Sequence, residues 1–357
     1  MSRYFYTSVI VFFVYITCSK SIEAQDVLPT QHYATPTLIN PALCTGGPLD
    51  TRMGIFMRQQ WLSQDQWFGG STAFSTVGAF MDFGLLENKL PQAGGSSRGS
   101  LNRSRLGLGL SLTNDYTVER TLSLTNFSGT VAYQQALTAN HSLSIGLQTA
   151  LNQRKLDISG LVFEDMVGPD GYIPGTPTQE TFDPTGHAID VSAGIAWEGS
   201  FLGEGRIPGR SKLRIRSGLG FFHLNAPLYS FLGEQSRLSR RYTGHVSAKW
   251  DAASYLIILP NALYVQQAQG TARIIQYGTN IGTPLRDAVA YTGFSHRIGE
   301  SASYHVGMDY RNVYFGFNVN QSVGGISGAS PSPVTFEAFL LLFLSTRSKS
   351  TMDCPVF

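Results

Sequence analysis

The side chains that could do chemistry in this chain include seven histidines, three cysteines and 24 acidic residues. The sequence has no His-Glu-x-x-His zinc helix and no glycine-rich phosphate loop that ends in Lys-Ser/Thr. His223 and His245 could be neighbours on adjacent strands, where hydrogen bonding is a simpler role than metal binding. Four acids have no evident acid–base partner: Asp65, Asp82, Glu164 and Asp165. We therefore predict a protein that is not an enzyme and that uses no cofactor and no metal.

An alternation of apolar and polar residues predicts β-strands as the elements that position these side chains. In residues 104–114, leucines at every second position, including Leu108, share one face, and small residues such as Gly109 share the other. Similar alternation runs through residues 142–152, 189–197, 213–221 and 244–251. If the leucine face meets lipid and the other face meets the lumen of a barrel, an arginine at position 108 is disruptive and a serine at position 109 is tolerated.

The length and number of these segments indicate the fold class. Many run for about ten residues, which is enough for a tilted strand to cross a bilayer. We count roughly fourteen of them, an even number, as single-chain bacterial barrels require. Only 14% of the residues are charged, and 38 are glycine. We therefore predict an all-β protein, a transmembrane antiparallel β-barrel of roughly 14 strands. A large exported β-sandwich is the alternative, because its strands alternate as well.

The first residues are typical of an export signal. Arg3 precedes an apolar run at residues 9–16, and small and polar residues follow it up to Ala24. The run is much shorter than the about 20 residues that a spanning helix needs, so we expect cleavage after Ala24. Lipid attachment at Cys18 is the alternative, although residues 15–17 form a poor lipobox. The formal net charge of +2 gives no indication of a nucleic-acid partner.

Turn-forming residues predict how the strands are connected. Residues 157–187 contain Gly168-Pro169-Asp170-Gly171 and Asp183-Pro184, and we expect this loop to lie outside the cell if the N-terminus is periplasmic. Residues 83–102 then form a long periplasmic connector. Pro260 lies inside a strand-like segment at residues 255–267, where it cannot donate a ladder hydrogen bond.

Motifs along most of the chain resemble one known family. The opening pattern is Gln31-x-Tyr33, Pro36, Asn40-Pro41-Ala42, Gly46, Arg52 and Arg58-x-Gln60-Trp61. It is similar to the start of the PorP/SprF family of type IX secretion and gliding-motility membrane proteins, with Met57 where an aromatic residue is expected. Later motifs follow in the common order: Gly218-x-Gly220-Phe221-Phe222, Leu285-Arg286-Asp287-Ala288, Gly307-x-Asp309-Tyr310 and Cys354-Pro355-x-Phe357.

The resemblance implies a non-enzymatic component of the type IX secretion system and gliding machinery in the bacterial outer membrane. Such a component assists the export or surface attachment of large proteins that carry a C-terminal sorting domain. Its partners would be outer-membrane lipid, other type IX secretion components and the secreted surface protein itself. An outer-membrane diffusion channel or a transporter of apolar solutes is the alternative, because it would use the same barrel architecture.

Four parts are expected: a signal peptide at residues 1–24, a periplasmic N-terminal segment at 25–51, the barrel at 52–346 and a C-terminal tail at 347–357. The expected partner-binding residues are Gln31, Tyr33, Pro36, Asn40, Pro41, Arg58 and Trp61. We expect the N-terminal segment to fold against the inner rim of the barrel and to bind a partner there. The alternative is that it only plugs the rim.

The two cysteines that remain after cleavage are Cys44 and Cys354. They stand before the first strand and after the last, and these two strands are neighbours in a barrel with an even number of strands. A disulfide between them is therefore possible in an oxidising compartment, provided that their Cα atoms come within about 7 Å. Two free thiols are the alternative.

Overall fold

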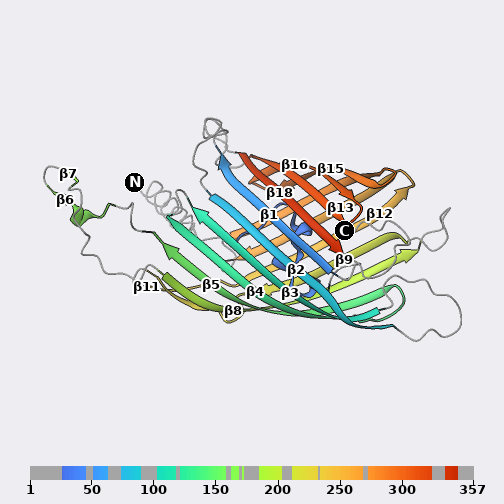
Figure 1. The fold of residues 1–357 in the computed structure, drawn as a ribbon, viewed down its shortest axis with the longest axis horizontal. Helices are drawn as coiled ribbons and strands as arrows, with labels where there is room; N and C mark the ends of the chain where they lie inside the picture. Colours follow the sequence, from blue (N-terminus) through green and yellow to red (C-terminus); the bar gives the residue numbers. More distant parts are fainter. Residues whose placement is uncertain are drawn as a thin grey trace, which may run out of the picture.

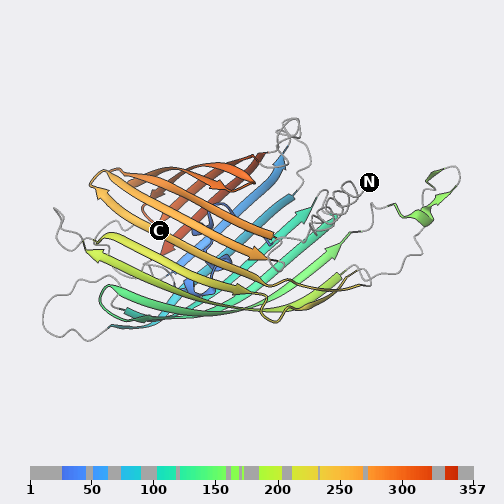
Figure 2. The ribbon, with the colours of Figure 1, turned by 180° about the vertical axis from the view of Figure 1, so that it is seen from behind.

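Among the residues that the structure describes, fourteen antiparallel strands close into one barrel in the computed structural model (Figures 1 and 2). The described residues are 26–45, 51–62, 74–89, 103–117, 121–157, 162–168, 171–172, 185–202, 211–231, 234–267, 272–323 and 334–344. The barrel strands are β1 (Thr51–Leu62), β2 (Phe74–Lys89), β3 (Arg103–Thr117), β4 (Leu122–Ala136), β5 (His141–Leu156), β8 (Thr185–Leu202), β9 (Ser211–Phe222), β12 (Arg241–Ala253), β13 (Leu256–Gln267), β14 (Ala272–Pro284), β15 (Ala288–Arg297), β16 (Ser301–Tyr310), β17 (Val313–Ser322) and β18 (Val334–Leu344). The predicted fold class is confirmed.

The barrel closes where its first and last strands pair. β1 and β18 run antiparallel from Thr51 opposite Leu344 to Leu62 opposite Val334, with one irregularity between Gln59 and Leu62. Two small sheets lie outside the ring of strands: β6 (Val167–Gly168) with β7 (Gly171–Tyr172), and β10 (Leu228–Phe231) with β11 (Glu234–Arg237). A short 3-10 turn, η6 (Glu164–Met166), precedes β6. No helix in the described ranges is long and apolar enough to cross a membrane.

The outward face of the barrel is apolar, as the alternation predicts. In β5, Ile145 and Leu147 point outward and are exposed, whereas Ser144 and Gln148 point inward and are buried. In water an apolar belt of this extent would be unfavourable, but in a bilayer it contacts lipid chains. The exposed side chains therefore place the wall of the barrel in a membrane.

The two ends of the barrel differ in their connections. β1 begins at the end where short turns join β4 to β5, β12 to β13, β14 to β15 and β16 to β17. The other end carries longer connections, among them those between β5 and β8 and between β9 and β12. We call these the short-turn end and the long-loop end. In outer-membrane barrels short turns face the periplasm and long loops face the outside, so the expected placement of residues 157–187 agrees with this asymmetry.

The connector expected at residues 83–102 is shorter than the sequence indicated. β2 continues to Lys89 because its pairing with β3 continues from Phe83 opposite Leu108 across a bulge to Lys89 opposite Arg103. Pro260 lies within β13, paired with Thr279 of β14. On the other side of the strand the β12 ladder runs from Ser247–Asn261 to Trp250–Ile258 and skips the position opposite Pro260, as a residue without an N–H requires.

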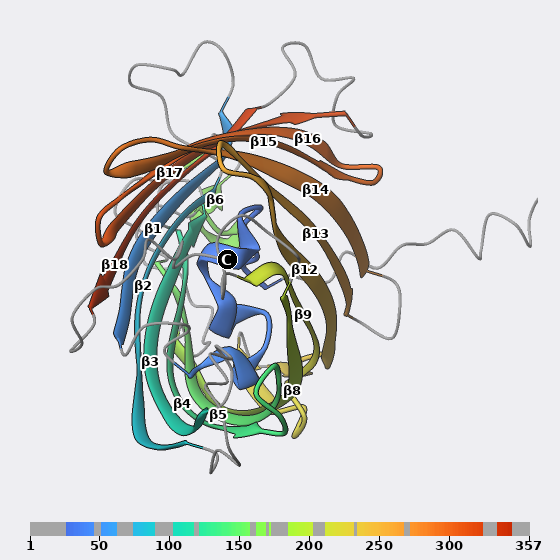
Figure 3. The same cartoon turned by 90° about the vertical axis from the view of Figure 1, so that its right-hand side faces the viewer.

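The lumen of the barrel contains the N-terminal segment (Figure 3). Residues 26–45, which we call the lumenal segment, pass through the ring of strands and bring apolar side chains with them. Ala34 packs in a buried cluster with inward-facing residues of the wall, and Leu28 and Ile39 pack in a second cluster. The wall residues of the first cluster are Phe56, Phe80, Ile257, Leu259, Val289, Tyr291, Tyr314, Phe339, Leu341 and Phe343. The hydrophobic core of this barrel is thus inside the lumen.

Replacing Leu108 with arginine is expected to destabilise the barrel by about 2–4 kcal/mol, because the outward face of β3 near mid-membrane would then hold a charge. The measurement is heat-modifiability on gels after membrane isolation, in which the folded band should be lost. Leu108→Phe is the matched control, since it changes shape but stays apolar, and its folded band should remain. Equal folded bands for the two variants would contradict a lipid-facing Leu108.

Candidate functional site: the lumenal segment and its contacts

Three single turns of 3-10 helix give the lumenal segment its compact shape. They are η1 (His32–Ala34), η2 (Pro36–Leu38) and η3 (Pro41–Leu43). Pro36 and Pro41 each stand at the first position of a turn, where a missing N–H is harmless and the fixed φ favours helix. Asn40 caps η3, because its Oδ1 accepts a hydrogen bond from the Ala42 N–H at 2.9 Å. The Asn40-Pro41-Ala42 motif of the sequence thus forms a capped turn.

Glycines on the inner wall make room for the second half of the segment. A Cβ atom at Gly107 would collide with the Cys44 carbonyl, one at Gly146 with Pro41, and one at Gly194 with the Asn40 amide. Gly220 lies in the same way under the Ile39 carbonyl, whose oxygen would stand 2.5 Å from an added Cβ atom. Four strands thus supply a smooth groove in which the backbone of the segment lies directly against the backbone of the wall.

The lumenal segment also covers Gly109, which faces the lumen. The Cys44 Sγ atom occupies the space that a Cβ at Gly109 would need. Serine at position 109, which polarity alone would allow, therefore requires the buried Cys44 side chain to shift, and its tolerance stays a prediction. The alternation placed Gly109 on the correct face, but it did not reveal that the segment covers that face.

One buried carboxylate anchors the middle of the segment. Both oxygens of Glu337 on β18 accept hydrogen bonds from the Thr30 N–H, at 3.1 and 3.0 Å, and Oε1 also accepts one from the Thr30 hydroxyl. The Arg58 guanidinium lies 3.1 Å from Oε1, and the Asn318 amide donates to Oε2 at 3.0 Å. Asn320 donates to the Thr30 hydroxyl at 2.9 Å. The charge of Glu337 is thus paired and hydrogen-bonded, as a buried carboxylate must be.

Buried donors from the wall hold the backbone carbonyls of the segment. Arg58 and Arg297 both donate to the Leu28 carbonyl, at 3.2 and 3.4 Å, and Gln276 donates to the Thr30 carbonyl at 2.7 Å. Gln31 is also fixed by side-chain contacts, because its amide donates to the Phe317 carbonyl at 3.3 Å. These contacts satisfy backbone groups that the segment, lacking a regular ladder, cannot satisfy itself.

A second ion pair fixes the segment near the short-turn end. Arg52 of β1 forms a bidentate pair with Asp82 of β2, with contacts of 2.8 and 2.6 Å, and donates to the Leu43 carbonyl at 3.2 Å. Arg105 donates to the Thr45 carbonyl at 3.2 Å. Cys44 is buried and has no disulfide partner among the described residues, and burial raises the pKa of its thiol above the ordinary range. Cys354 lies outside the described residues, so the disulfide stays a prediction.

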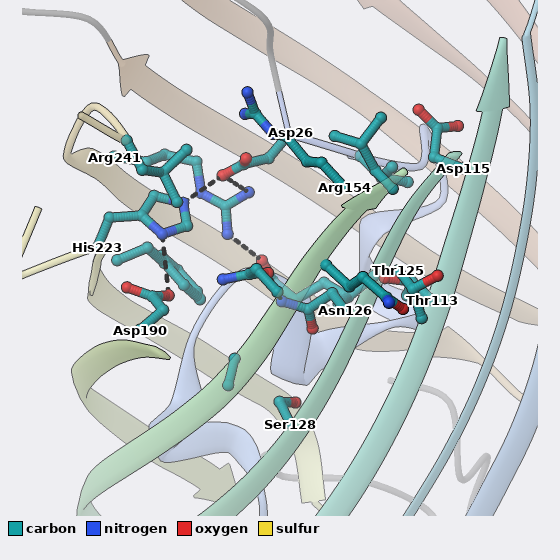
Figure 4. Close-up of a pocket in the computed structure, with 18 of the residues that line it drawn as sticks. Asp26, Thr113, Asp115, Thr125, Asn126, Ser128, Arg154, Asp190, His223 and Arg241 are labelled. Carbon is teal, nitrogen blue, oxygen red and sulfur yellow. Dashed lines mark hydrogen bonds and ion pairs between the residues drawn. The ribbon is translucent and has the colours of Figure 1, made fainter. Parts of the chain in front are cut away.

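Asp26 ends the segment in a network at the long-loop end (Figure 4). Its Oδ2 atom lies 2.6 Å from Nε2 of His223 and 3.0 Å from a guanidinium nitrogen of Arg241. The other ring nitrogen of His223 lies 2.9 Å from Asp190 on β8. Burial alone would lower the pKa of His223, but the Asp26 charge and the hydrogen bonds to Asp190 and Asp26 raise it to about 9. The imidazole is therefore protonated at neutral pH and donates from both nitrogens. The same cations outweigh burial and lower the pKa of Asp26.

A polar cavity of about 110 Å³ lies beside this network, lined by residues that include Asp115, Asn126, Arg154 and Asp190. It is smaller than the about 300–1,000 Å³ of a pocket for a drug-sized ligand. No group of three or more His, Cys, Asp or Glu side chains in the described part of the chain could hold a metal ion. His245 hydrogen-bonds with the Asn40 amide at 3.1 Å and is paired with Gly218, so it does not adjoin His223.

The structure places most of the expected partner-binding residues inside the barrel. Those that it buries there are Gln31, Pro36, Asn40, Pro41 and Arg58, and Tyr33 is half-buried beside them. Trp61 is separate: it lies at the long-loop end of β1, is 41% exposed, and packs edge to face on Phe74. We expected the segment at the inner rim, and the structure shows it running through the lumen.

Sequence reasoning missed Asp26, Glu337 and Arg297, which take part in the polar contacts between the segment and the wall. A signal for Glu337 was present, because it is the one charged residue in the apolar run of β18, at an inward position of the alternation. No comparable signal existed for Asp26, which stands in a segment without periodicity.

Comparisons with known proteins found one family model and several solved structures of low sequence identity. A family model described as "Type IX secretion system membrane protein PorP/SprF" matches residues 21–341. The crystal structure of the Ralstonia pickettii toluene transporter TbuX is similar with a TM-score of 0.45 and 12% identity, covering 87% of this chain and 94% of that chain. The CymD monoaromatic hydrocarbon channel is similar with a TM-score of 0.48 and 10% identity, covering 92% of this chain and 96% of that chain. No curated protein matched.

Replacing Glu337 with glutamine is expected to lower the free energy of unfolding by about 3–5 kcal/mol, because Arg58 would be left buried without its counter-charge. The measurement is the guanidinium unfolding midpoint of the purified protein in detergent. Glu300→Gln is the matched control: its partner Arg297 lies at 2.9 Å, but the Glu300 side chain is 48% exposed. That variant should lose only about 0–1 kcal/mol. Equal unfolding midpoints for the two variants would show that Glu337 does not anchor the segment.

The stability of the protein is expected to fall as the pH rises through the His223 pKa of about 9. A group whose pKa is raised on folding contributes its full stabilisation below the unfolded-state value of about 6.5, and the contribution disappears as the folded-state group loses its proton. Thermal unfolding in detergent between pH 6 and pH 10 measures this, with His223→Gln as the control. The wild type should lose more stability over that interval than the variant; parallel curves would show that His223 carries no such contribution.

Proposed function

Because this chain belongs to the PorP/SprF family of type IX secretion system membrane proteins, we propose that it is a non-enzymatic component of the type IX secretion and gliding machinery. It lies in the bacterial outer membrane. There it assists the export or surface attachment of large proteins that carry a C-terminal sorting domain. Its partners are the surrounding lipid, other components of the secretion system and the exported protein.

The observation that supports this proposal is the occupied lumen. The lumenal segment is held by Glu337, by Arg52 and by the network around Asp26. Its removal would take the Asp26 carboxylate from Arg241 and would remove hydrogen-bond partners from the buried Glu337 and Arg52. A barrel filled in this way acts through surfaces at its two ends, which a rigid wall holds apart. The same contacts argue against an open diffusion channel or an apolar-solute transporter, because polar and charged groups fill the path that a solute would take.

Most of the proposed partner-binding residues lie inside the barrel and do not reach its surface. The buried or half-buried members contribute indirectly, by holding the segment in place: Gln31, Tyr33, Pro36, Asn40, Pro41 and Arg58. Trp61 is the exposed member of the proposed set and lies at the long-loop end, on the side where a cargo protein is displayed. Large exposed aromatic side chains are frequent anchors in protein interfaces.

In cells that lack this protein, a reporter with a C-terminal sorting domain is expected to be lost from the surface, and the wild-type chain should restore it. Trp61→Ala should reduce surface labelling by about tenfold, the effect of losing one interface anchor. Tyr255→Ala is the matched control, because Tyr255 is an exposed aromatic residue at the opposite end of the barrel. Labelling that is unchanged when the protein is absent would refute the secretion role.

A conductance measurement in planar bilayers distinguishes a secretion component with an occupied lumen from a diffusion channel. The intact protein should give no steady single-channel conductance, because its lumen is occupied. A regular conductance from the intact chain, together with normal display in its absence, would favour the channel.

A further inference from the structure

Asp26 contacts the barrel wall in the way that a bound ligand contacts its receptor site. The carboxylate is contributed by the end of the lumenal segment, whereas the wall contributes His223, Arg241 and Asp190. With His223 protonated, these wall groups carry two positive charges and one negative charge. The Asp26 carboxylate brings the buried group to neutrality, which is the role of an anion in a receptor site.

The wall arranges these cations without help from Asp26. The Arg241 guanidinium carbon lies 4.0 Å from the centre of the Phe222 ring, which fixes the plane of the group. His223 has a positive φ of 58°, an uncommon conformation for a residue with a side chain. The turn that follows is held to β8, because Asn225 accepts from the Val191 N–H at 3.1 Å and donates to the Ile189 carbonyl at 2.8 Å. Arg241 also donates to the Leu38 carbonyl of the segment at 3.0 Å, so the wall and Leu38 hold the two cations in place whether or not Asp26 occupies the site.

Asp26 is the most accessible member of the group. Its side chain is 24% exposed, against 7% for His223 and Arg241 and 4% for Asp190. It lies at the long-loop end, and the polar cavity of about 110 Å³ adjoins it, leaving space for the atoms next to an incoming carboxylate. The buried Oδ1 atom of Asp190 at the cavity has no hydrogen-bond partner among the described residues. As an acceptor it suits an N–H group of the ligand beside the carboxylate, not the carboxylate itself.

We propose that His223 and Arg241 form a binding site for the carboxylate of an acidic peptide, and that the chain's own Asp26 occupies this site as an internal competitor. The ligand is a peptide carboxylate, from an acidic side chain or from a chain terminus. A tethered ligand has an effective concentration on the order of millimolar, so an external carboxylate binds weakly until Asp26 is displaced. The inference concerns ligand chemistry and stands independently of the secretion role.

The test uses the full-length mature protein in detergent and compares the wild type with Asp26→Asn. Asp26→Asn keeps the shape of the side chain and removes its charge, so the site is left with one uncompensated positive charge. Sodium acetate should raise the melting temperature of Asp26→Asn, and should do so at concentrations roughly tenfold lower than those at which it acts on the wild type. Sodium chloride at equal ionic strength should not have this effect.

Two further probes identify the source of the carboxylate. N-acetyl-aspartyl amide offers a side-chain carboxylate, and N-acetyl-trialanine offers a terminal one; stabilisation of Asp26→Asn by either supports the site and names its source. Asp26→Ser replaces Asp26→Asn if the latter does not fold. In the double variant Asp26→Asn/Arg241→Gln the response to acetate should disappear. An equal response to chloride, or no response to any carboxylate, would overturn the proposal.

Discussion

The charge of Glu337 is the constraint on which the lumen depends. A carboxylate cannot remain ionised inside a packed interior unless cations and donors surround it. The wall supplies Arg58 and Asn318, but the Thr30 backbone and hydroxyl come from the lumenal segment. Neither the wall nor the segment is complete alone: without the segment Glu337 loses three of its hydrogen bonds, and without Glu337 the Thr30 N–H is left inside the protein.

The two sides of the lumen hold the segment by different physical means. Strands β1, β2, β13, β14, β15, β17 and β18 present large apolar side chains such as Phe339 and Leu341, so the contact there is hydrophobic packing. Strands β3, β5, β8 and β9 present glycines, and there the segment lies against bare backbone. Packing against side chains tolerates small adjustments, whereas backbone contact does not, because a single added methyl group has nowhere to go. The glycine side therefore fixes where the segment lies.

Much of the barrel could be predicted from the sequence, because the alternation in β3 or β5 reports directly on a wall with one apolar face. The turn at Asn40-Pro41 was predictable as well, since proline and a capping side chain act locally. The position of residues 26–45 was not, because no periodicity marks a segment that is buried on all sides. Gly107 and Gly146 illustrate the limit: a glycine at a lumenal position indicates close approach, but the sequence does not name the approaching chain. Asp26 and His223 are 197 positions apart, and only the folded barrel brings them together.

The register of the closing strands has a consequence for the order of assembly. Arg58 and Glu337 are direct partners across the β1–β18 seam, and the lumenal segment is bonded to both. The complete Thr30 anchor thus forms only when the last strand has arrived beside the first. Ring closure therefore completes the Thr30 anchor at the seam. A barrel still open at that edge would lack the Glu337 contacts and would hold the segment through its remaining ones, such as the glycine side and the donors Arg52 and Arg241. A chain truncated before β18 would lose both the seam and the Glu337 anchor.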